Sequence, residues 1–230
     1  MELGPAFRTA GHWHLAVFEP EGSADGDPPD AAAQLCLTGP NGAGTVTTDC
    51  TPLTATVASV GVTYNLQTVD SVAVALIPTA TPNRSEPALL VRASFSGGGS
   101  GTLTKLSVWT YTRVDATPFN GGPGGFFMEV FSSVVTNGGE QRFIPSGPLA
   151  GCFVSAEQVC LAGPTMADPQ PFHLRVFRRA GVGFVPVLGL LTARAYPTIR
   201  GGDPPANPVE REMPRLRRAL AALYPRGWPR

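Results

Sequence analysis

Short apolar stretches that alternate with glycine- and proline-rich separators constrain the fold of this 230-residue chain more than any other feature. Separators such as SGGGSG (96–101) and NGGPGG (120–125) contain residues that permit positive φ or make local hydrogen bonds, which is typical of turns. Between the separators, alternation with a period of two predicts about ten short strands. They lie near residues 12–18, 33–38, 53–69, 72–77, 88–96, 102–114, 126–135, 152–161, 172–179 and 183–196, and the segment 53–69 is long enough for either one strand or two. Strands at this spacing, with no helical pattern between them, predict an all-β fold, either a β-sandwich or a jelly roll.

Composition places the chain among folded proteins with no net charge. Hydrophobic residues make up 43% of the chain and charged residues 15%, a balance that does not suit a disordered protein. The 17 basic and 17 acidic residues cancel, so the whole molecule has no long-range attraction to nucleic acid or to a membrane. The longest strongly apolar uncharged segment, residues 180–193, is shorter than the roughly 20 residues that span a bilayer. We therefore expect no membrane segment, and the N-terminal residues show no secretory signal.

One amphipathic helix is predicted, near the C-terminal end of the sequence. Its apolar face consists of leucines spaced at i, i+4 and i+7, namely Leu216, Leu220 and Leu223. Either Pro208 or Pro214 can begin this helix, and Pro225 ends it.

The helix defines the expected domain organisation. The segment before it, PTIRGGDPPANP (197–208), has the composition of a linker with polyproline character. We therefore expect a β-sandwich or jelly-roll body over residues 1–198. Residues 199–230 then form a Pro/Gly linker and an Arg-rich helical arm.

Opposite charges gather in two segments of the chain. Residues 19–30 (EPEGSADGDPPD) carry five carboxylates and no base, whereas residues 209–230 carry six arginines and two glutamates. A helix of this kind can dock into a partner groove, pack on its own domain or contact nucleic-acid phosphates. The predicted interaction residues are Arg211, Arg215, Arg217, Arg218, Leu216, Leu220 and Leu223 in the helix, with Glu19, Glu21, Asp25 and Asp27 in the acidic segment. We expect the acidic segment of one copy to meet the arginine-rich arm of another.

The stretch GHWHLAVFEPEG (11–22) raises the question of a metal site. On a strand, His12 and His14 point to the same face, at the spacing that lets two imidazoles reach one ion. With Glu19 following, the stretch resembles the first metal-binding motif of the cupins, a jelly-roll family. The resemblance implies that a distant histidine, here His173, completes the ligand set. The sequence departs from the family because the strands that normally precede the motif are missing before His12, and no glycine-containing turn precedes His173.

The faces of the same strand argue against a metal site. Trp13, Leu15 and Val17 form its apolar face, so we expect them to point into the core. In an unbroken strand Glu19 lies on the face of Trp13, away from both histidines. We therefore predict no metal and no other cofactor, with His12, His14 and His173 as the only metal candidates.

The four cysteines, Cys36, Cys50, Cys152 and Cys160, allow three disulfide pairings. None belongs to a CxxC pair, which leaves a structural zinc site with little support. Buried free thiols and disulfides both remain open at this point.

Motifs for catalysis are weak or missing. SGGGSGTLTK (96–105) lacks the GK[ST] end of a phosphate-binding loop, and no GxSxG nucleophile elbow occurs in the sequence. The carboxylates of residues 19–30 lie in a proline-rich segment, where solvation leaves them as surface charges. We therefore predict a protein without enzymatic activity.

These observations favour a structural protein that is a subunit of an ordered assembly, such as a virus capsid or a capsid-decoration protein. Its partners are then copies of itself or other subunits, and its location is a virion or another extracellular assembly, with the cytoplasm as the alternative. Nucleic acid is the less favoured partner of the Arg-rich arm. Two further interpretations stay open: a disulfide-stabilised extracellular binding or adhesion module, and a cupin-like metal-binding protein.

Overall fold

The computed structural model describes most of the chain as antiparallel β-structure. The described residues are 1–9, 11–21, 31–40, 45–57, 61–79, 81, 84–96, 102–114, 124–159, 168–197 and 207–225. They contain thirteen strands and two helices, α1 (Gly4–Phe7) and α2 (Pro208–Leu223). The predicted all-β class with one C-terminal helix is confirmed, and the strands are more numerous than the sequence pattern indicates.

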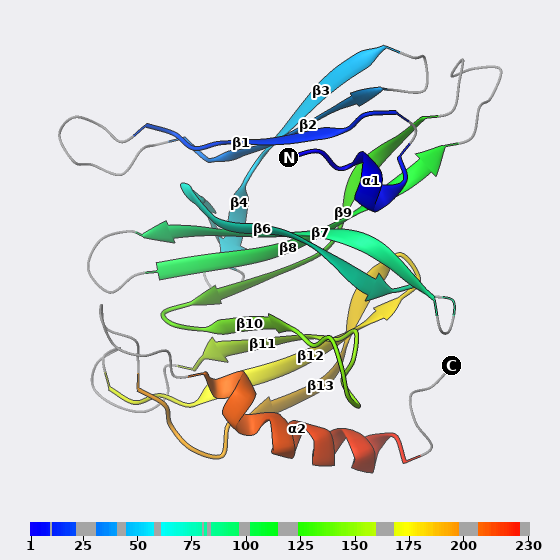
Figure 1. Cartoon of the computed structure of the whole chain (residues 1–230). Coiled ribbons are helices and arrows are strands. Elements are labelled where there is room, and N and C mark those ends of the chain that lie inside the picture. Colours follow the sequence, from blue (N-terminus) through cyan, green and yellow to red (C-terminus); the bar gives the residue numbers. More distant parts are fainter. Residues whose placement is uncertain are drawn as a thin grey trace. The chain divides into compact units, whose positions relative to one another are not determined.

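In each sheet, strands that are neighbours in space are also consecutive in the chain (Figure 1). The first sheet contains β1 (His14–Phe18), β2 (Gln34–Pro40) and β3 (Val46–Pro52), and a separate pair contains β4 (Thr54–Val57) and β5 (Val62–Asn65). The second large sheet contains β6 (Thr68–Pro78), β7 (Ser85–Ser96), β8 (Thr102–Val114) and β9 (Gly124–Thr136). The third contains β10 (Glu140–Phe143), β11 (Phe153–Gln158), β12 (Phe172–Ala180) and β13 (Gly183–Leu191). Each large sheet is therefore a meander joined by local connections.

The chain divides into two compact units. The first unit contains Met1–Ile77, Ser85–Phe95 and Thr104–Val134, and the second contains Pro78–Arg84, Ser96–Leu103 and Val135–Arg230. Helix α2 thus belongs to the second unit together with strands β10 to β13. The separate body and arm expected from the sequence stay a prediction.

Strand β1 in the first unit has the predicted alternation. Trp13 and Leu15 are buried and Val17 is half-buried, whereas His14 and Phe18 are exposed. The indole of Trp13 lies against Gly39 of β2, where an added Cβ would come within 2.2 Å of the ring. This position therefore requires glycine. The predicted inward face of the strand is confirmed.

Strands β2 and β3 are joined covalently. Cys36 and Cys50 lie directly opposite each other in the antiparallel register, and they form a disulfide. Cys152 is a free thiol and is buried in the second unit. Cys160 lies outside the described residues. The two readings of the cysteines left open by the sequence therefore both occur, at different cysteines.

The core of the second unit lies between its sheet and helix α2. Alternate residues of β11 and β12 point to this core, as do two helix leucines and Val209. The buried residues of the cluster include Val154, Ala156, Phe172, Leu174, Val176, Leu188, Val209, Leu216 and Leu220. Helix α2 runs along this sheet, and its backbone lies closest to β10 and β11 (Figure 1). Two of the three leucines of the predicted apolar face, Leu216 and Leu220, thus pack on this sheet, whereas Leu223 is exposed.

The N-terminus of α2 is bound by a side chain from the sheet. Asn207, the residue before the helix, makes no side-chain cap, and Pro208 supplies no N–H. The backbone N–H of Val209 instead donates to Oε2 of Glu140 on β10, at 2.9 Å. A carboxylate at this end satisfies a free helix N–H and interacts favourably with the helix dipole. The helix therefore begins at the first of its two predicted starts, and Pro214 lies within it.

Truncation of Leu216 tests this packing. Leu216 is fully buried, so Leu216→Ala removes apolar contacts and leaves a cavity, and we expect the free energy of unfolding to fall by about 2–5 kcal/mol. Leu223→Ala is the matched control, because Leu223 is 56% exposed on the same helix. Chemical denaturation of both variants measures the difference. Equal stability losses would contradict the arrangement.

Cysteine mapping tests the two thiol environments. Burial raises the pKa of Cys152 to about 11, so at pH 8 the native thiol stays protonated and we expect it to resist alkylation. In denaturant, Cys152 should be labelled readily. Peptide mass spectrometry without reductant should show Cys36 linked to Cys50. Rapid native labelling of Cys152, or an unlinked Cys36, would contradict the structure.

Candidate interaction surface

Helix α2 carries most of the predicted interaction residues, and the structure places them on two different sides. Leu216 and Leu220 are buried in the core of their own unit, whereas Leu223 is exposed. Arg211, Arg217 and Arg218 are exposed, and Arg215 is half-buried. The apolar and basic residues that the sequence groups together therefore have different roles in the fold. Leu216 and Leu220 pack in the core, and Arg211, Arg217 and Arg218 face solvent.

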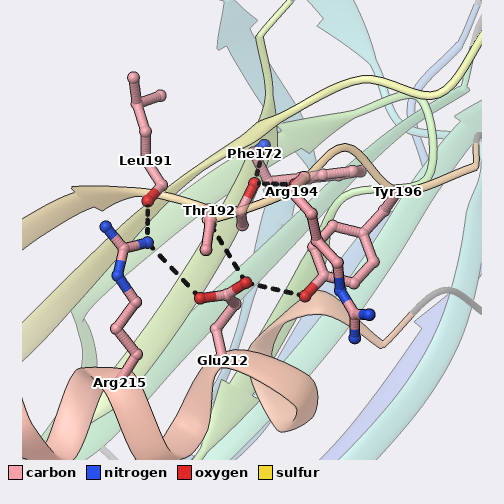
Figure 2. Close-up of polar contacts among 8 residues, drawn as sticks. Phe172, Leu191, Thr192, Arg194, Tyr196, Glu212 and Arg215 are labelled. Atoms are coloured by element: carbon pink, nitrogen blue, oxygen red, sulfur yellow. Dashed lines mark hydrogen bonds and ion pairs between the residues drawn. The ribbon is translucent and has the colours of Figure 1, made fainter.

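A buried carboxylate holds the helix to the sheet. Glu212 is only 5% exposed, and its Oε1 accepts hydrogen bonds from the hydroxyl of Tyr196 at 2.9 Å and the N–H of Ala193 at 3.2 Å. Nη1 of Arg215 lies 3.5 Å from its other oxygen and also donates to the backbone oxygen of Leu191 (Figure 2). A buried charge is stable only when it is paired and hydrogen-bonded, and Glu212 meets both conditions. These contacts determine which side of the helix faces the sheet.

The chain that leads from β13 to Tyr196 is bound in the same network. The hydroxyl of Thr192 donates to the backbone oxygen of Arg194 at 2.7 Å and accepts from the N–H of Phe172 at 3.0 Å. The guanidinium of Arg194 lies 5.2 Å from the centre of the Tyr196 ring. Burial and the nearby Glu212 carboxylate raise the pKa of Tyr196 despite this cation. The hydroxyl therefore stays protonated and can donate to Glu212.

Three arginines remain on the outer side of the helix. Arg211, Arg217 and Arg218 have no carboxylate within 4.0 Å in the part of the chain that the structure describes. Glu210 is the exposed acidic residue of this helix, and Arg142 lies 3.6 Å from it. We call Arg211, Arg217 and Arg218 the basic helix face. It is a positive surface on a helix whose other side is held in place.

The acidic segment is described only at its start. Glu19 is exposed, and its Oε1 accepts the backbone N–H of Val69 on β6 at 2.6 Å. Glu21 is exposed, while Asp25 and Asp27 lie outside the described residues. The structure thus ties the beginning of this segment to the first unit.

The histidines are distributed over both units. His12 and His14 lie beside Glu2, with 3.1 Å between Nε2 of His14 and Oε2 of Glu2 and 4.0 Å between Nδ1 of His12 and Oε1. The hydrogen bond from the N–H of Gly4, and then the charge of His14, lower the pKa of Glu2. Among the described residues, no three His, Cys, Asp or Glu side chains form a group that could hold a metal ion. That the protein binds no metal stays a prediction.

His173 belongs to a different surface, a shallow depression of about 420 Å³ on the second unit. Its walls are largely apolar and come from β13 and the end of α2, with His173 and Arg175 at one side. Nη2 of Arg175 lies 2.8 Å from Glu157, and its Nε donates to Nδ1 of His173 at 3.4 Å. The arginine charge is therefore compensated by a neighbour on the same sheet.

Comparison of the chain with protein-family models, curated proteins and solved structures gives no match. No helix in the described ranges is long and apolar enough to cross a membrane.

The variant Tyr196→Phe tests the buried network. It removes a hydrogen bond to a buried carboxylate, and we expect a loss of about 1.5–3 kcal/mol in the free energy of unfolding. Tyr64→Phe is the control, since the half-buried Tyr64 packs on Phe95 and its hydroxyl makes no hydrogen bond to a described residue.

The pH dependence gives the same test a second readout. The raised pKa of Tyr196 means that its contribution to stability is complete below its ordinary pKa of about 10 and is lost as the pH rises above that value. The stability of the unsubstituted protein should therefore fall more steeply above pH 10 than that of Tyr196→Phe. Parallel pH profiles would contradict the role of this hydroxyl.

Proposed function

We propose that the protein is a non-enzymatic structural protein, a subunit of an ordered assembly such as a virus capsid or a capsid decoration. The observation that carries the proposal is the basic helix face, which is exposed and has no acidic partner among the described residues. The chain as a whole has no net charge, and five carboxylates lie in residues 19–30. Copies of this chain therefore carry complementary charges for one another.

The rigidity of the helix supports a contact of this kind. Glu140 binds its N-terminus, its own residue Glu212 accepts a hydrogen bond from Tyr196, and its Leu216 is buried. A surface that is already ordered loses little conformational entropy when a partner binds. The basic helix face is thus prepared to receive the acidic segment of another copy.

The geometry of this contact favours an extended assembly. The basic helix face and the acidic segment are different surfaces of one chain. Each copy can therefore contact one neighbour through its helix and another neighbour through its acidic segment. Contacts between different surfaces join copies head to tail. Such a chain of copies either closes into a ring or continues as an open array, in which the end copies keep a free surface.

The Cys36–Cys50 disulfide supports a location in an oxidising environment. Disulfides persist on secreted proteins and on virion surfaces and are rare in the cytosol. We therefore propose a virion or another extracellular assembly over the cytoplasm. The same disulfide favours the second candidate function, a disulfide-stabilised extracellular binding or adhesion module.

Charge reversal tests the contact. We expect Arg211→Glu, Arg217→Glu and Arg218→Glu together to weaken self-association by about a hundredfold or more, because like charges then oppose each other. Adding Glu21→Lys, Asp25→Lys and Asp27→Lys to the same chain should restore association with the charges exchanged. Sedimentation velocity at 50 and 500 mM NaCl measures both, and salt should weaken association of the unsubstituted protein.

A matched control has the same change in net charge elsewhere. Arg8, Arg84 and Arg113 are exposed, and reversing all three should leave association unchanged. A monomer at every salt concentration would refute the assembly proposal. Nucleic acid that copurifies with the protein and is lost in the helix variant would favour the phosphate-binding alternative instead.

A further inference from the structure

Strand β6 lies at the edge of the second large sheet and is eleven residues long. Within the described part of the chain it has a strand partner on one side only, β7. The other side of an edge strand presents backbone N–H and C=O groups that are able to pair with another strand. A strand of this length therefore offers a substantial pairing surface.

The middle of β6 lacks the features that usually protect an edge. Residues 71–77 read SVAVALI and contain no charge and no proline, although edge strands are commonly blocked by lysine, proline or an inward charge. The two ends differ from this middle: the N–H of Val69 donates to Glu19, and Pro78 has no N–H. The stretch open to pairing is thus confined between these two residues.

Apolar side chains are exposed along the same stretch. Val74 is 40% exposed and Leu76 is 67% exposed, and Val72 is half-buried. Residues at i, i+2 and i+4 share one face of a strand, so these three side chains form a single apolar row. The open edge and the apolar row lie on the same seven residues.

We propose that β6 of one copy pairs antiparallel with β6 of a second copy, around a two-fold axis at Val74. In this register Val74 faces its own counterpart, and Val72 of each copy faces Leu76 of the other. The apolar rows of both copies then join into one patch of six side chains, and no charged residue faces another between 71 and 77. A second copy is the occupant because the sequence of this edge is complementary to itself under a two-fold rotation.

This inference rests on the proposed function, since it names a second contact of the same assembly. A contact between identical surfaces joins two copies and leaves no free surface for a third. The contact between helix and acidic segment leaves free surfaces, so further copies can bind through it. Together, the two contacts link β6-paired dimers into an extended array. They involve different residues, so each contact can be removed without the other.

Lysine substitutions test the pairing. Val74→Lys places two lysines opposite each other at the axis, and with Leu76→Lys we expect the dissociation constant of the pair to rise at least tenfold. Both positions are exposed, so the fold should survive, and thermal unfolding checks it. Val46→Lys with Val62→Lys is the control, because these valines are also exposed but lie on β3 and β5.

The measurement is sedimentation equilibrium at 500 mM NaCl in the charge-reversed helix variant. These conditions suppress the contact between helix and acidic segment and leave the β6 pairing. A dimer that the β6 lysines abolish and the control lysines spare supports the inference. A monomer under these conditions, with salt-sensitive assembly of the unsubstituted protein intact, overturns the inference alone.

A disulfide trap tests the register independently of stability. Directly opposed residues in an antiparallel pair have Cα atoms about 4.5–5.5 Å apart, within the range of a disulfide. Val74→Cys should therefore form a covalent dimer under mild oxidation, whereas Val46→Cys should not. Absence of the Val74 dimer, or equal yields at both positions, would overturn the proposed register.

Discussion

The orientation of helix α2 depends on one buried carboxylate. Glu212 lies on the side of the helix that faces the sheet, where an unpaired charge would be costly to bury. Tyr196, Ala193 and Arg215 together satisfy it. Arg215 lies on the same helix, whereas Tyr196 and Ala193 become partners only when the helix lies on the chain that follows β13. The burial of Leu216 and the outward direction of the basic helix face both follow from this arrangement.

The edge strands of the sheets impose a second constraint on the structure. Meanders of two to four strands have many edge strands for their size, and each edge has unpaired backbone groups. The first residues of edge strand β6 are bound by Glu19, whereas residues 71–77 carry neither a charge nor a proline. This uncharged stretch is the physical basis of the pairing that we propose between copies.

Several features were accessible from the sequence because they depend on local alternation. The inward face of β1 follows from Trp13 and Leu15, and the extent of α2 follows from its leucines and from Pro225. Strands β3 and β10 were missed. β3 is exposed at six of its seven residues and β10 is a short polar segment, so neither has the apolar alternation that marks a strand. Both form because a neighbouring strand supplies their hydrogen bonds.

By itself, the sequence determined the all-β class, the C-terminal helix and the separation of acidic and basic segments, since each depends on residues close together in the chain. The tertiary structure alone decided which arginines face solvent. Arg215 turns toward Glu212 and the backbone of Leu191, while Arg211, Arg217 and Arg218 do not. It also decided that Cys36 pairs with Cys50 and that Cys152 stays a buried thiol. These outcomes depend on register and on packing between elements distant in sequence, which a periodic pattern of residues does not encode.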